Sequence, residues 1–150
     1  MSYHHTQRGS IHYLLYPIAA VMVASIFFLP PLLPLRILIW VVAGIPATLG
    51  SAFARLTVSD RGDHLSVRFG PLPLFGTRIR YDEITSVESG RTALMDGWGI
   101  HYAPARGWTY NIAGRDCVEL AVNGRTVRVG TDDVEELMDF LRGRVVLSAP

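Results

Sequence analysis

The sequence contains no lysine, and Cys117 is the single cysteine among its 150 residues. One cysteine excludes an intrachain disulfide and a cysteine-rich zinc site. All 14 basic residues are arginines, so every cationic contact is made by a guanidinium group. They nearly balance the 13 acidic residues, and a net charge of +1 gives no strong field for nucleic acid. We therefore expect no nucleic-acid partner.

Charge is also scarce in the first third of the chain. Residues 11–29 carry no formal charge, and residues 35–53 carry one arginine at their start. As a helix, each segment is about 28 Å long, close to the thickness of bilayer hydrocarbon. The prolines within residues 30–34 force a tight turn between them. The pattern predicts a two-helix transmembrane hairpin over residues 11–53, and thus the lipid bilayer as a partner.

Two other interpretations of the apolar third are a cleaved signal peptide and a soluble helical hairpin. A cleaved signal peptide needs a small-residue cleavage site after residues 11–29, but a second apolar run follows almost at once. A soluble helical hairpin must be covered by the remaining domain, which offers too little surface for two helices that are apolar on all sides. Segment length and the absence of charge favour the membrane. No carboxylate lies in either span, which argues against a transporter.

The arginines near the spans predict the orientation. Arg8 precedes the first span, Arg55 and Arg61 follow the second, and only Arg36 lies near the turn. Positively charged flanks remain in the cytoplasm. We therefore expect a multi-pass protein of the inner (cell) membrane with both termini cytoplasmic. The expected division of the chain is an N-terminal tail over residues 1–10, the hairpin over 11–53, a domain over 54–145 and a C-terminal tail over 146–150.

The remaining two-thirds alternate apolar and polar residues with the period of a β-strand. Turn signals separate the runs; the 60–63 turn and the proline-rich loop at 70–76 are two of them. Asn123-Gly124 between two alternating runs is a strong hairpin signal. Short, closely spaced strands predict a small antiparallel barrel or sandwich.

A C-terminal helix is expected to cover this barrel. Thr131 or Asp132 is placed to cap it, and Asp132 with Glu135 fits a capping box. The apolar residues fall on one face at helical spacing: Val134, Leu137, Met138 and Leu141.

The stretch from 96 to 114 is rich in aromatic residues. Ile100 and Tyr102 share the parity of Trp98, and the expected partner strand contains a second aromatic row: Trp108, Tyr110 and Ile112. Facing rows across an antiparallel pair stabilise a sheet, so we interpret them as a core face and its rim, with a ligand pocket as the alternative. The opposite parity predicts that His101, Thr109 and Asn111 face away from the core.

In combination, several motifs over residues 54–145 resemble the bacterial PH-like (pleckstrin-homology-like) domain membrane proteins. These motifs read, in order, YDEITSVES, GWGI, YNIAG, VEL and NGRTVRVGTDDVEELMDFL. The resemblance implies a strongly bent barrel of about seven antiparallel strands, closed by a C-terminal helix. It implies no defined activity, because fold does not specify function. Eukaryotic PH domains often bind phosphoinositides with basic residues around the first hairpin. Here Arg61 and Arg68 are present, but Asp60 and Asp63 flank that loop, and this departure argues against inositol phosphate binding.

The sequence favours binding over catalysis. It shows no nucleophile elbow or other catalytic spacing, and the parity of Cys117 predicts a non-core position. No metal-ligand spacing is present, and His4 and His5 fall in the predicted tail. We expect no catalytic residue, metal or cofactor, although an enzyme stays the third alternative. The leading hypothesis is an integral membrane protein that presents a cytoplasmic PH-like binding or scaffold domain.

Two kinds of binding partner are candidates for this domain. In the first, Arg68, Arg78 and Arg80 meet anionic lipid headgroups beside an apolar loop that contains Leu74 and Phe75; an ordinary solvated strand face is the alternative.

In the second, edge strands and the rim around Trp98 recruit a protein partner or a second copy of the chain.

Overall fold

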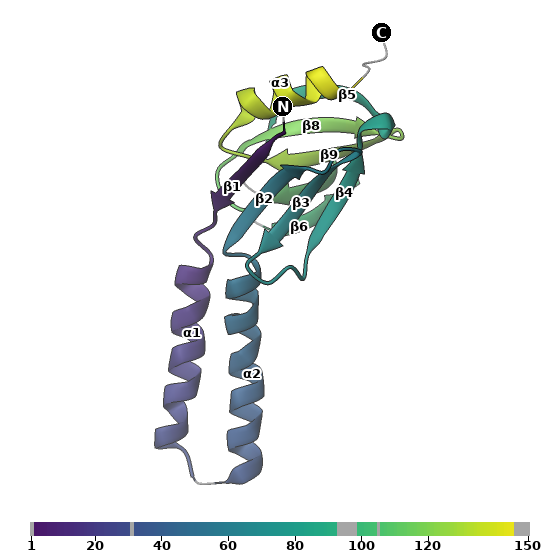
Figure 1. Cartoon of the computed structure of the whole chain (residues 1–150). Coiled ribbons are helices and arrows are strands. Elements are labelled where there is room, and N and C mark those ends of the chain that lie inside the picture. Colours follow the sequence, from purple (N-terminus) through teal and green to yellow (C-terminus); the bar gives the residue numbers. More distant parts are fainter. Residues whose placement is uncertain (1, 31, 93–98, 105, 146–150) are drawn as a thin grey trace.

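A two-helix hairpin and a β-rich body make up the molecule (Figure 1). The computed structural model describes residues 2–30, 32–92, 99–104 and 106–145. The helices are α1 (His12–Ala24), its short 3-10 extension η1 (Ser25–Phe28), and α2 (Leu33–Ala52). They project together from one end of the body, away from its two sheets (Figure 1).

The two helices differ in length. The 20 residues of α2 make it the one described helix that is both long and apolar enough to cross a bilayer. The 13 residues of α1 and four of η1 fall short of the 19-residue span that the sequence predicts. The first segment is shorter because Leu29 is extended (φ −101°, ψ 153°), as a residue before a proline tends to be. The structure thus supports one candidate span and an adjoining shorter apolar helix.

The body consists of two sheets. The first has the order β1-β2-β3-β4, and its strands are β1 (His4–Arg8), β2 (Arg55–Asp60), β3 (His64–Gly70) and β4 (Gly76–Arg80). The second has the order β5-β8-β9-β7-β6, and its strands are β5 (Ile84–Arg91), β6 (Gly99–Ala103), β7 (Gly107–Asn111), β8 (Asp116–Val122) and β9 (Arg125–Gly130).

These sheets correct the predicted seven-stranded antiparallel barrel. The described residues form nine strands, and β7 pairs with β9 in parallel. The two sheets do not close into a barrel, because the turn η2 (Tyr81–Glu83) redirects the chain after β4 and β5 then pairs with β8. An additional strand comes from the segment interpreted as a tail: β1 pairs with β2 along its whole length. Both ends of the helical hairpin therefore enter adjacent strands of one sheet.

The inner faces of the sheets and helix α3 (Val134–Arg144) enclose the core. Its largest fully buried side chains include Phe69, Leu56, Leu65, Leu120, Leu137 and Leu141. Leu137 and Leu141 come from the predicted apolar face of the helix, which confirms that this face covers the sheets. The predicted cap is wrong in detail: Asp133 is the N-cap residue and makes no side-chain capping bond, while its N–H is bonded to Thr131 Oγ1 at 3.0 Å.

Part of the second sheet is buried on both faces, contrary to its alternation pattern. Thr109 and Asn111 are each 1% exposed, and Cys117 is fully buried. The Asn111 amide donates to Thr92 Oγ1 and to the Gly114 carbonyl, and Thr92 is itself bonded to Arg115. Thr92 and Gly114 thus lie against Asn111, in contacts that strand parity alone does not reveal.

Candidate membrane-facing site

The outer face of the first sheet is basic. The β3–β4 register sets Ser66 opposite Arg78 and His64 opposite Arg80, so these side chains and Arg68 share one face. Arg68 and Arg78 are exposed, and neither makes an ion pair with another described residue. A shallow hollow of about 550 Å³ lies between them and the β3–β4 loop. Its wall therefore combines guanidinium groups with apolar side chains.

The β3–β4 loop presents apolar side chains to the outside. Leu72 is 42% exposed, Leu74 58% and Phe75 38%. Scattered exposed apolar residues are normal on a soluble protein, but three within four positions of one loop form a local patch. As the sequence predicts, the loop separates two strands, since β3 ends at Gly70 and β4 begins at Gly76.

Phe53 connects this loop to the end of helix α2. Its ring stacks on Phe75 with centroids 5.1 Å apart and an interplanar angle of 16°, and it meets Phe69 edge-on at 5.0 Å. Phe53 is the C-cap residue of α2. Figure 1 shows the β3–β4 connection beside the end of this helix. The apolar loop and the adjacent arginines thus lie where the apolar hairpin joins the β-rich body.

Arg80 differs from the other two arginines. Its Nε and Nη2 donate to the carboxylate of Asp82 at 2.9 and 2.6 Å. This bidentate contact raises the pKa of Arg80 and lowers the pKa of Asp82. Arg80 also lies at the opposite end of β4 from the apolar loop. It is therefore the least suited of the three predicted residues to hold an external anion.

Sequence reasoning missed two arginines of the same face. Arg8 on β1 and Arg55 on β2 are direct register partners. Both are exposed, and neither pairs with an acidic side chain among the described residues. Like charges directly opposite each other destabilise a sheet, so an external anion between them stabilises the pair. The sequence did not reveal them because residues 4–8 were interpreted as a tail. Only the pairing of β1 with β2 sets Arg8 beside Arg55.

The aromatic row on β6 and β7 is graded from core to surface. Tyr102 faces Trp108 and Ile100 faces Tyr110, which confirms the predicted pairing. Burial decreases along the row: Tyr110 is partly buried, whereas Trp108 is 41% exposed. Trp98 lies outside the described residues.

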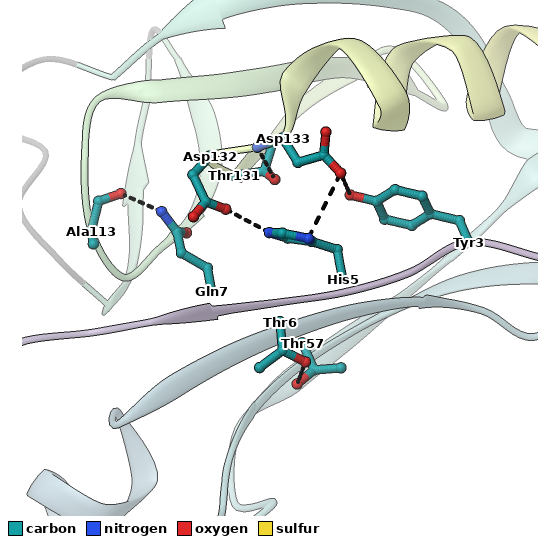
Figure 2. A network of polar contacts seen from close by, with 9 residues as sticks. All are labelled: Tyr3, His5, Thr6, Gln7, Thr57, Ala113, Thr131, Asp132 and Asp133. Carbon is teal, nitrogen blue, oxygen red and sulfur yellow. Dashed lines mark hydrogen bonds and ion pairs between the residues drawn. The ribbon is translucent and has the colours of Figure 1, made fainter.

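A polar network ties β1 to the start of α3, as Figure 2 shows. His5 Nε2 lies 2.5 Å from Asp132 Oδ1, and its Nδ1 lies 3.7 Å from Asp133 Oδ2. Tyr3 donates to the same Asp133 oxygen at 3.5 Å. Burial, together with the charge of Asp133, raises the pKa of Tyr3. Asp132, one of the two predicted caps, instead contacts His5, and the network connects the first strand of the chain to the start of its last helix.

Among the described residues, no three His, Cys, Asp or Glu side chains cluster as a metal-binding group would. Comparison with models of known protein families finds no match to this chain, and no curated protein matches it either.

Proposed function

We propose that the chain is an integral membrane protein whose apolar hairpin anchors a cytoplasmic, PH-like binding domain. The domain acts by contact with anionic lipid headgroups, and it carries no catalysis. The hairpin is the first support. Within α2 only Ala43, Gly50 and Ala52 are buried, and its side chains Ile37, Trp40 and Val41 are more than half exposed. In water, this surface is strongly unfavourable, whereas bilayer hydrocarbon solvates it.

The stacking of Phe75 on Phe53 is the observation that carries the headgroup contact. It fixes the apolar loop at the end of the candidate span, which is the depth of the headgroups if α2 crosses the bilayer. Arg8, Arg55, Arg68 and Arg78 then lie on the sheet that continues from this end of the hairpin. Arginines near an anionic leaflet contribute about 1 kcal/mol each.

The test compares lipid selectivity in the intact chain. A fluorophore on Leu72→Cys reports quenching by spin-labelled phosphatidylglycerol or phosphatidylcholine in nanodiscs; Cys117 is buried and does not compete for the label. The double variant Arg68→Gln/Arg78→Gln removes about 2 kcal/mol of attraction, so we expect its preference for phosphatidylglycerol to fall by about tenfold or more. Arg142→Gln on α3 is the matched control. Equal quenching by both lipids in the parent chain contradicts the headgroup contact.

A protein partner is the second candidate, supported by the free edge of β4. This strand is an edge of its sheet among the described residues, and a groove of about 480 Å³ beside it is lined by Trp108, Tyr110 and Arg125. Exposed edges recruit strands from other chains. A photo-crosslinking residue in place of Thr77 tests this candidate in native membranes. A discrete adduct, either with another protein or with a second copy, supports it, and the absence of any adduct removes it.

A further inference from the structure

A small apolar cavity lies where the helical hairpin meets the second sheet. Its volume is about 290 Å³, near the lower end of the range for ligand pockets, roughly 300–1,000 Å³. Its lining comes from both helical segments and from the sheet: Ile11, Leu15, Leu49, Phe53, Gly99, Ile100 and Ile112. No lining residue carries a charged or hydrogen-bonding side chain. The lining therefore suits hydrocarbon, and none of its side chains offers a polar partner to a nucleotide, a metal ion or a peptide backbone.

The cavity runs from the core toward the surface of the hairpin. At its inner end Ile112 is 1% exposed, whereas Leu49 on α2 is 38% exposed. Leu49 lies one helical turn before the end of α2, so the open side faces the same surroundings as the apolar hairpin. An apolar cavity holds apolar ligands in preference to water.

We infer that this cavity seats an acyl chain of a bilayer phospholipid. The inference rests on the proposed membrane location of the hairpin. The open side at Leu49 lies four residues, about 6 Å, further into the bilayer than Phe53 at the headgroup level, where acyl chains begin. The lining selects the chain rather than the headgroup. Lipids with the same chains and different headgroups are therefore expected to occupy the cavity alike, in contrast to the anionic preference of the basic face.

Two neighbouring leucines provide a matched pair of variants. Leu15 lines the cavity, whereas Leu14 is not in the lining and is 63% exposed. Leu15→Trp fills the space, and Leu14→Trp adds the same ring on the outside. Ile100→Phe fills the cavity from the sheet side and guards against a folding defect peculiar to the helix variant.

The experiment uses the full chain, purified in a mild detergent and examined by native mass spectrometry. We expect a phospholipid to stay bound to the parent chain and to Leu14→Trp, and its occupancy to fall at least tenfold in Leu15→Trp and Ile100→Phe. Addition of phosphatidylcholine to delipidated chain then raises the thermal midpoint of the first two proteins and not of the filled ones, whereas phosphatidylglycerol also stabilises the filled ones through the basic face. Thermal midpoints without lipid show whether each variant is folded.

Several results overturn the inference. They are the absence of bound lipid on the parent chain, equal occupancy in the Leu14 and Leu15 variants, and stabilisation by phosphatidylglycerol alone. The last result leaves the headgroup contact intact while removing the acyl-chain site. If instead the preference for anionic lipid is absent while the lipid stays bound, the headgroup contact is refuted and the acyl-chain site stands. The two proposals therefore fail separately.

Discussion

The Asp60 carboxylate holds together three segments at the end of the domain farthest from the hairpin. Its side chain is only 4% exposed. Oδ1 accepts hydrogen bonds from the Gly62 N–H and from the Tyr81 hydroxyl, both at 2.8 Å, and Oδ2 lies 2.7 Å from Nη2 of Arg144. These contacts join the β2–β3 turn, η2 and the end of α3. Although burial alone raises the pKa of this carboxyl, these hydrogen bonds and the charge of Arg144 hold it below its usual value.

We expect Asp60→Asn to destabilise the domain by about 2 kcal/mol. Asparagine keeps the shape, but it replaces charge-assisted hydrogen bonds by neutral ones and loses the attraction to Arg144, and hydrogen bonds to charged groups contribute about 1 kcal/mol more than neutral ones. For a domain of this size, 2 kcal/mol lowers the thermal midpoint by about 8–16 °C. Near-UV circular dichroism of the full chain in detergent follows this transition. Asp63→Asn is the control, because the Asp63 side chain is exposed and its hydrogen bond is to the neighbouring His64.

The pH dependence of this difference tests its cause. A carboxyl whose pKa is lower in the folded state contributes stability that is present above its unfolded pKa of about 3.9 and is lost as the pH falls through the folded value. The gap between the midpoints of the parent and Asp60→Asn chains is therefore widest near neutral pH and narrows below about pH 4. A variant that melts with the parent chain at neutral pH, or a gap that persists unchanged in acid, refutes the reasoning.

Two further predictions concern the backbone and the N-terminal strand. We expect Gly107→Ala to lower the free energy of unfolding by about 2 kcal/mol or more, because φ is +74° and an added Cβ lies within 1.9 Å of the Thr126 carbonyl oxygen. Urea unfolding measures this change, and Gly114→Ala, where the space around the Cβ is open, is the control. A loss of stability no larger than that of Gly114→Ala contradicts the prediction. His5→Ala removes the contacts to Asp132 and Asp133, so we expect amide hydrogen exchange in β1 to become faster than in β3. His4→Ala, on the outer face of the same strand, is expected to leave exchange in both strands as in the parent chain. Unchanged exchange in His5→Ala contradicts this prediction.

Local patterns account for much of the observed fold. Asn123-Gly124 forms the predicted turn between β8 and β9, with positive φ at both residues (49° and 72°). The period of two located the strands, and the helical spacing of Leu137 and Leu141 located the helix that covers the core. These features depend on neighbours in sequence, which a single chain reveals.

The pairing of strands that lie far apart in the sequence could not be predicted. Nothing local to residues 4–8 indicates that they pair with β2 across the whole hairpin, or that β7 lies parallel to β9. The candidate site was incomplete for the same reason. Arg68 and Arg78 are found from strand parity, but Arg8 joins them only through β1, and the contact of Arg80 with Asp82 depends on the η2 turn.

In the proposed topology, the hairpin crosses a bilayer and the domain lies on the cytoplasmic side. Single cysteines at Ser2, Leu32 and Arg142, all exposed positions, report which side of the membrane each reaches. With a membrane-impermeant thiol reagent, we expect Leu32→Cys to be labelled in intact bacterial cells, and Ser2→Cys and Arg142→Cys only in inverted vesicles. Labelling of all three positions from one side contradicts the account.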